Sequence, residues 1–163
     1  MKQEHLVHSI PPTYDAHSKV LILGSFPSPK SREFGYFYGH PQNRFWKVLA
    51  SVFADDIPVS IEEKRDFLLR HHIAVWDVVH TCTITGASDS SITNVTVNDL
   101  TRILQGAEIQ KIFVNGKTAY NLYQKYILPD SGRAATCLPS TSPANAAWSL
   151  ERLTEAWQII RIN

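Results

Sequence analysis

Short apolar runs alternate along the chain with segments in which apolar residues recur at helical spacing. The runs cover residues 19–24, 73–79, 111–114 and 134–138 and predict four buried strands. Helical spacing is found from Phe45 to Val52, in two pieces across residues 50–72 that Pro58 separates, and over residues 98–103, 118–126 and 146–160. This alternation predicts an α/β fold of three layers, α/β/α, around a mainly parallel four-stranded central sheet.

Length and composition agree with one ordinary globular domain. The chain has 163 residues, of which 44% are hydrophobic and 19% charged, so we expect a single domain over residues 1–163. Residues 1–18 are predicted to be a lead-in segment that packs loosely. No run approaches the roughly 18 apolar residues of a membrane span, and the N-terminus lacks a basic-then-apolar signal pattern. We therefore expect a cytoplasmic monomer with no membrane partner.

Charge, cysteines and histidines limit the chemistry. The formal net charge is only +1, so a role on DNA must rest on local motifs. Cys82 and Cys137 are too few for a cluster held by four thiolates and are predicted to be small buried residues. The seven histidines show no HExxH or similar spacing, so we expect no metal and no cofactor.

An unusual loop follows the first predicted strand, at the sheet edge where α/β proteins place their ligands. Residues 24–29, GSFPSP, are expected neither to continue the strand nor to begin a helix, because two prolines remove backbone donors. The aromatic segment FGYFYG, residues 34–39, comes next. Its rings either plug the core or form a platform for a flat ligand.

Polar residues also follow the other predicted strands. Residues 80–92 are expected to form a long polar loop, and Asn98 is expected to cap the next helix. Asn115 either faces the ligand edge of the sheet or caps the helix that follows it. Residues 139–145, PSTSPAN, place three hydroxyls before a helix predicted to begin at Ala146, where the donors and helix dipole would favour a phosphate. Ordinary N-capping of that helix would need only one of these three hydroxyls.

These motifs together resemble the uracil-DNA glycosylase superfamily. Residues 38–48, YGHPQNRFWKV, are similar to its aromatic-x-HPxNRFWKV segment, and GSFPS takes the place of its first motif. In the mismatch-specific branch an asparagine of that motif positions the attacking water, and Phe26 stands there in this chain. GSFPS resembles instead the deoxyinosine branch, whose catalytic asparagine lies elsewhere in the same segment, which points to Asn43.

The resemblance extends to the later motifs. PSTSPAN resembles the second motif, with Ser142 matching its phosphate-binding serine, Ala144 its intercalating leucine and Ser140 its leading asparagine, a departure from the family pattern. Residues 89–92, DSSI, resemble a polar run of the deoxyinosine branch or form a solvated loop.

The resemblance implies a monofunctional DNA glycosylase that acts on duplex DNA carrying a deaminated base. Hypoxanthine is the first choice, with xanthine or uracil as further substrates. Asn43 would orient water through its amide oxygen. The base would be bound by Phe26, Tyr38, Asn115 and Ser25, the DNA phosphates by Ser140, Ser142 and Asn145, and the duplex would be intercalated by Ala144.

Three other functions fit the same residues. One is a mismatch-specific uracil or thymine glycosylase. Another is a non-catalytic nucleic-acid-binding protein on the same fold, because a fold alone does not fix function. The last is an enzyme acting on free nucleosides, for which the hydroxyls of residues 140–142 would have no flanking phosphate to bind.

Overall fold

A parallel sheet of four strands forms the centre of the protein, whose computed structural model describes residues 3–85 and 91–162. The strands run in the order β3 (Ile73–Asp77), β2 (Val20–Gly24), β6 (Lys111–Asn115) and β7 (Thr136–Leu138). Every residue of β2 and β3 is buried, as expected for parallel strands covered on both faces.

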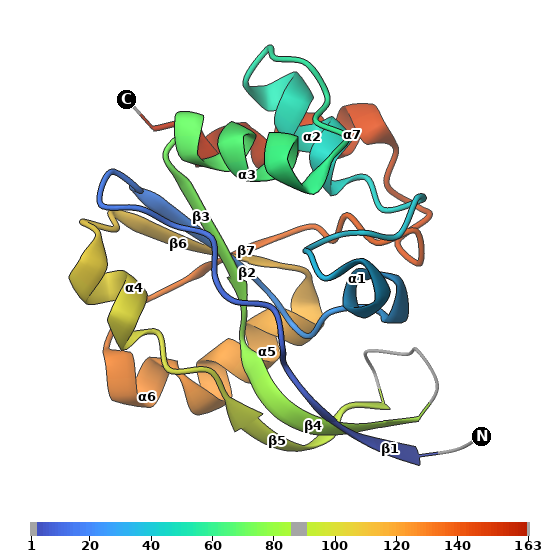
Figure 1. The fold of residues 1–163 in the computed structure, drawn as a ribbon, viewed down its shortest axis with the longest axis vertical. Helices are drawn as coiled ribbons and strands as arrows, with labels where there is room; N and C mark the ends of the chain where they lie inside the picture. The colour runs from blue at the N-terminus through green and yellow to red at the C-terminus, as the bar shows by residue number, and fades with distance from the viewer. Residues whose placement is uncertain (1–2, 86–90, 163) are drawn as a thin grey trace.

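Helices cover both faces of this sheet (Figure 1). On one side lie α2 (Phe45–Val52), α3 (Ile61–Arg70) and α7 (Leu150–Trp157), which a short 3-10 helix, Gln158–Ile160, extends. On the other side lie α4 (Thr101–Gly106), α5 (Lys117–Tyr126) and α6 (Leu128–Ser131). The predicted three-layer fold with a four-stranded parallel sheet is therefore confirmed. Among the described residues, none of the helices has the length and apolar character needed to span a membrane.

A second sheet was not predicted. The antiparallel strands β1 (Gln3–Val7), β4 (Val79–Thr85) and β5 (Thr93–Val97) pair in the order β1-β4-β5. Figure 1 shows β4 leaving the central sheet almost directly from the end of β3. The expectation of a polar loop over residues 80–92 is thus wrong for residues 80–85, where β-branched threonines and Ile84 form a strand.

The N-terminal lead-in is not loose. After β1, Ile10 is buried, and its carbonyl accepts a hydrogen bond from Trp76 Nε1 at 3.0 Å. Thr13 bridges Val75 through its backbone and is hydrogen-bonded to the Tyr36 hydroxyl at 2.7 Å. The segment therefore packs onto β3. The prediction failed because β1 directs mostly exposed, polar side chains outward and shows no hydrophobic alternation.

Three predictions about where helices begin, or which residue caps them, differ from the structure. Residues 24–29 do begin a helix: in α1 (Pro29–Phe34), Ser28 caps the N-terminus and Pro29 takes the first turn, where its missing N–H costs nothing. The last helix begins at Leu150, with Ser149 as its cap, and not at Ala146. Asn98 does not cap α4, because its amide donates to the backbone carbonyls of Asp77 and Val79.

Candidate functional site

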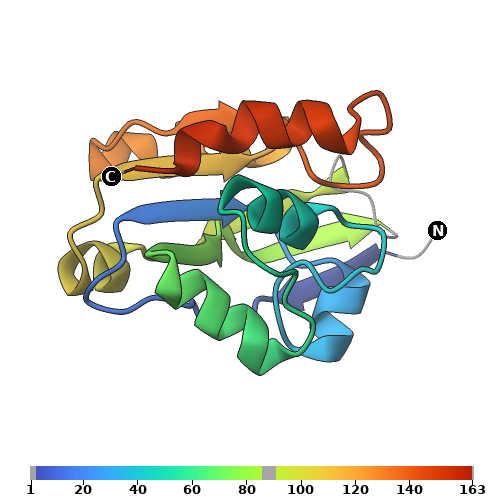
Figure 2. The same cartoon turned by 90° about the horizontal axis from the view of Figure 1, so that it is seen from above.

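The carboxyl ends of β2, β3 and β6 bring Gly24, Asp77 and Asn115 to one edge of the central sheet. Gly24 is required there because a Cβ would lie 2.4 Å from Asp77 Oδ1 and 3.0 Å from Tyr38 Oη. A carboxylate and a phenol thus converge over a strand end that has no side chain of its own. This edge is also the one reached by the α1–α2 segment and the β7–α7 loop, which lie side by side in Figures 1 and 2.

The rings of the aromatic segment lie at different depths, and Tyr38 is the one that faces the ends of the strands. Tyr36 and Phe37 are buried core residues, and burial raises the pKa of the Tyr36 phenol above its usual value. Tyr38 is half-buried, adopts a left-handed backbone with φ of 52°, and stacks on Phe45 with ring centroids 3.9 Å apart. Positive φ is costly for a bulky residue and concentrates at functional sites. Phe45 covers one face of the ring, so any base would stack on the opposite face.

Asn43 and Asn115 meet through a residue that the sequence did not single out. Thr141 is completely buried, and its hydroxyl donates to Asn43 Oδ1 at 2.8 Å. The same hydroxyl accepts from Asn115 Nδ2 at 3.0 Å, and the Thr141 backbone N–H donates to Asn115 Oδ1 at 3.1 Å. Asn115 therefore does not cap α5; the capping position is taken by Gly116, which has no side chain. Thr141 lies between two serines in the sequence, and nothing in the pattern separates it from them.

The predicted role of the Asn43 oxygen meets a geometric obstacle. Asn43 Oδ1 also accepts the backbone N–H of Phe45 at 2.9 Å, so this oxygen already receives two hydrogen bonds. An amide oxygen has two lone pairs. It cannot orient a water molecule as an acceptor while both contacts persist.

Arg44 fastens the β7–α7 loop to the segment that carries Asn43. Its guanidinium donates to the backbone carbonyls of Ser142 and Asn145, each at 3.1 Å, and to that of Trp148. Its backbone N–H donates to the Thr141 carbonyl at 3.0 Å. The two segments are therefore held as one unit.

The predicted phosphate-binding residues do share one loop, but not a helix N-terminus. Ser140 Oγ accepts from the Ser142 N–H at 3.1 Å, and Ser142 Oγ accepts from the Ala144 N–H at 3.2 Å. Asn145 Nδ2 donates to the Ser140 carbonyl at 3.0 Å. Since α7 begins only at Leu150, the predicted help from a helix dipole is wrong. The serine hydroxyls accept these bonds and keep their protons for a further acceptor, and Ala144 is exposed.

Phe26 and Ser25 lie deeper than a base-binding role would suggest. Both are 7% exposed, and Phe26 packs edge-to-face against His8 with centroids 5.8 Å apart. The carbonyls of Gly24 and Ser25 accept the N–H groups of Val78 and Val79 at 2.8 and 3.0 Å. Phe26 thus supports the wall of the site. Asp89 of the DSSI segment lies outside the described residues.

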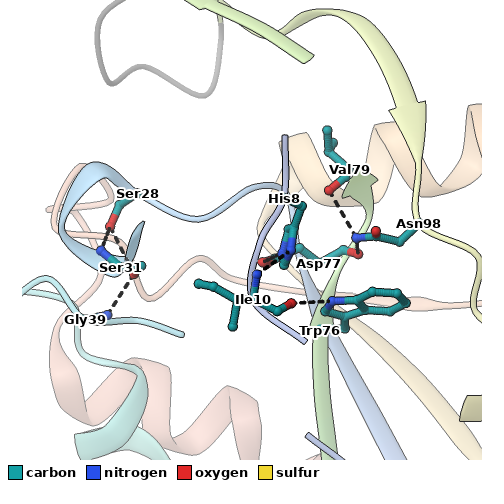
Figure 3. Close-up of polar contacts among 9 residues, drawn as sticks. All are labelled: His8, Ile10, Ser28, Ser31, Gly39, Trp76, Asp77, Val79 and Asn98. Atoms are coloured by element: carbon teal, nitrogen blue, oxygen red, sulfur yellow. Dashed lines mark hydrogen bonds and ion pairs between the residues drawn. The ribbon is translucent and has the colours of Figure 1, made fainter. Parts of the chain in front are cut away.

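A buried His8–Asp77 pair was missed entirely. His8 Nε2 lies 2.8 Å from Asp77 Oδ2, and His8 Nδ1 accepts the Ile10 N–H at 3.3 Å (Figure 3). A backbone N–H can only donate, so Nδ1 carries no proton and Nε2–H donates to the carboxylate. The two side chains are 2% and 5% exposed. Their separation of 69 positions left no local signal.

Features elsewhere carry no part of this site. A surface hollow of about 360 Å³ lies at the opposite edge of the sheet and is lined by Leu104, Gly106 and Arg133, among others. In the described ranges, 3–85 and 91–162, no three histidine, cysteine, aspartate or glutamate side chains gather as a metal site would require. The two cysteines are free thiols, Cys82 buried as predicted and Cys137 exposed, which corrects its expected burial. That the protein needs no cofactor stays a prediction.

Comparisons with known proteins agree with this arrangement. A family model described as the uracil DNA glycosylase superfamily matches residues 11–161. Two proteins named hypoxanthine DNA glycosylase are each 31% identical to the chain. The one from Methanosarcina acetivorans aligns over 92% of this chain and 94% of its own length, and the one from Methanosarcina barkeri over 90% and 92%.

A solved structure is similar as well. The solution NMR structure of a candidate uracil DNA glycosylase from Methanosarcina acetivorans is 29% identical, with a TM-score of 0.80. The match covers 94% of this chain and 96% of that one. The family match and the sequence identity, together with the similar fold, show that the chain belongs to the uracil DNA glycosylase superfamily.

Proposed function

We propose that this protein is a DNA glycosylase that hydrolyses the N-glycosidic bond of deoxyinosine and releases hypoxanthine. The observation that carries the proposal is the identity of 31%, over at least nine tenths of the chain, to two proteins named hypoxanthine DNA glycosylase. The site supports it, since half-buried amides and an aromatic ring gather at the ligand edge of the sheet. The proposed substrate is duplex DNA, and the proposed acting species is a monomer.

The reaction requires the base to leave the stack, because its glycosidic bond cannot be reached inside a duplex. The face of the Tyr38 ring opposite Phe45 would receive the flipped base, and such stacking contributes roughly 1–3 kcal/mol with little choice between bases. Asn115 retains one amide proton and one lone pair beyond its bonds to Thr141, enough to read one donor–acceptor pair of the base edge. Ser142 would bind a phosphate beside the flipped nucleotide, with Ser140 and Asn145 shaping its loop.

In the proposed hydrolysis the bond between C1′ and N9 breaks, and its electron pair leaves with the base. The oxygen of a water molecule then bonds to C1′, and the displaced proton passes to the released base or to solvent. Water and not a protein amine attacks, which makes the enzyme monofunctional. Asn43 is the proposed catalytic residue in this step.

One assay tests the proposal. Oligonucleotide duplexes containing a single inosine, xanthine, uracil or G·T mismatch are incubated with the enzyme, and abasic sites are cleaved with alkali and counted. We expect the inosine strand to be cut fastest. Preference for uracil or the mismatched thymine would replace hypoxanthine by the mismatch-specific activity. Binding without cutting on all four duplexes would indicate a non-catalytic DNA-binding protein.

A further inference from the structure

The hydrogen bonds around Asn43 fix which end of its amide faces the site. Its Oδ1 accepts from the Phe45 backbone N–H at 2.9 Å and from Thr141 Oγ1 at 2.8 Å. Turning the amide over would place an NH₂ group against a backbone N–H, two donors with no acceptor between them. The oxygen therefore points at Phe45 and Thr141.

Thr141 receives its own orientation from Asn115. The Thr141 backbone N–H donates to Asn115 Oδ1 at 3.1 Å, which fixes that amide with Nδ2 toward the Thr141 hydroxyl at 3.0 Å. Because Asn115 Nδ2 is a donor, the hydroxyl must accept there, and its only proton goes to Asn43. Two backbone N–H groups, of Thr141 and Phe45, thus set the direction of every hydrogen bond in this network.

The amide nitrogen of Asn43 remains available to donate a hydrogen bond to a ligand. Among the described residues Nδ2 makes no hydrogen bond, whereas the oxygen makes two. We infer that Asn43 acts on the substrate as a hydrogen-bond donor, and that Thr141 is the positioning residue that holds it in this orientation. The inference deepens the proposed glycosylase function and rests on it.

A donor at this position suits the departing base. As the bond between C1′ and N9 breaks, the electron pair spreads negative charge over N3, N7 and O6 of the purine, which are acceptors. A hydrogen bond to an atom that gains charge strengthens as the reaction proceeds, so a fixed donor lowers the barrier. Asn43 would thereby stabilise the leaving group and not act as the acceptor that orients water.

Replacing Asn43 separates the two roles. Asn43→Asp keeps the size of the side chain and both bonds to Phe45 and Thr141 but replaces the NH₂ donor with an oxygen. We expect its single-turnover rate on the inosine duplex to fall by about 100-fold or more, close to that of Asn43→Ala. A rate for Asn43→Asp at least tenfold above that of Asn43→Ala would overturn the inference and assign Asn43 an acceptor role.

Thr141 has a matched pair of variants. Thr141→Val removes the hydroxyl without changing shape, and we expect kcat to fall by about tenfold or more while KM and binding to abasic product DNA stay within about threefold. Thr141→Ser restores the hydroxyl and is expected to recover most of kcat. Equal losses of kcat and of product binding in Thr141→Val, or no rescue by serine, would mark Thr141 as a structural residue only.

A readout independent of activity separates this inference from the proposed function. In ¹⁵N-labelled wild-type protein, both side-chain amide protons of Asn43 should exchange rapidly with solvent, while one of those of Asn115 is protected by Thr141. Protected Asn43 protons would contradict the inference even if the enzyme excises hypoxanthine. Failure of the wild-type protein to cut any of the four duplexes would instead refute the proposed function and leave this measurement valid.

Discussion

The two sides of the site hold their polar groups in different ways. On the β2–β3 side a carboxylate, Asp77, is buried against His8 from the N-terminal segment. On the β6–β7 side Asn43, Thr141 and Asn115 form a network of amides and a hydroxyl without any charge. Both sides obtain their proton directions from backbone N–H groups, that of Ile10 on one side and those of Phe45 and Thr141 on the other.

The two sides differ in how much folding stability is lost when one hydrogen-bond partner is removed. When a buried carboxylate loses its partner, the free-energy cost of its desolvation is no longer compensated, and the folded protein is destabilised. A neutral amide that loses one partner costs far less in folding. We therefore expect substitutions on the charged side to be felt mainly in stability and substitutions on the neutral side mainly in the rate of base excision.

The largest expected effect is on the charged side. His8→Leu removes the imidazole N–H from the buried Asp77 carboxylate and should lower the free energy of unfolding by about 3–5 kcal/mol, measured by urea denaturation. His8→Gln is the control, since its amide N–H takes the place of Nε2–H, and should retain most of the stability. If the His8→Leu variant is as stable as the wild type but excises hypoxanthine slowly, the charged side contributes to the reaction and not mainly to stability, contrary to this comparison.

Next in size is Asn43→Ala on the neutral side. Loss of one preorganised polar group should slow excision by about 10²–10³-fold, or about 2.7–4 kcal/mol of barrier, with affinity for undamaged DNA within a few fold. Single-turnover cutting and fluorescence anisotropy measure the two quantities. Excision at the wild-type rate would move the catalytic role to Ser25, Asp89 or Ser140.

Asn115→Ala should have a smaller effect. It removes both the contact proposed for the base edge and the bonds that orient Thr141, and unpaired groups of this kind cost about 1–3 kcal/mol each. We expect excision of hypoxanthine to slow by tenfold or more, while affinity for an abasic product, which has no base to read, is unchanged. Equal losses on both ligands would limit Asn115 to holding the loop.

Ser142→Ala is expected to change least. Removing one neutral hydrogen bond to a phosphate should weaken DNA binding by about 0.5–1.5 kcal/mol. The dependence of affinity on salt should stay as it is, because a hydroxyl releases no counterions. Ser149→Ala, which removes the cap of α7, is the matched control and should lower stability without changing DNA affinity. A change in the salt slope for Ser142→Ala would argue against a simple phosphate contact.

Apolar runs were sufficient to predict the central sheet. The strands β2 and β3 are buried on both faces, so every one of their residues contributes to the apolar pattern. The strands β4 and β5 were missed because both contain several threonines and are partly exposed, and residues 80–85 of β4 were included in a predicted polar loop. The start of the last helix was misplaced because Ala146 and Ala147 favour helix, although the bonds from Arg44 to the carbonyls of residues 142, 145 and 148 hold that stretch as a loop.

The family, fold and enzyme class inferred from the motifs are confirmed by the comparisons. The individual site roles stay predictions. Asn43 and Asn115 were singled out because each is a polar residue in a recognisable motif or at a strand end. Thr141 and the His8–Asp77 pair could not be, because their importance arises from contacts between residues 26 to 98 positions apart in the sequence.

The position of β1 in the chain constrains the order in which the protein assembles. Val7 pairs with Thr81 and Gln3 with Thr85, so β1 has no strand partner until β4, which lies more than 70 residues further along the chain, has been synthesised. Bringing such distant segments together carries a loop-closure entropy, and long-range pairing of this kind slows folding. Asp77 likewise gains its His8 partner only when the N-terminal segment docks. Cutting the chain at residue 11, where the family match begins, would remove both β1 and that imidazole.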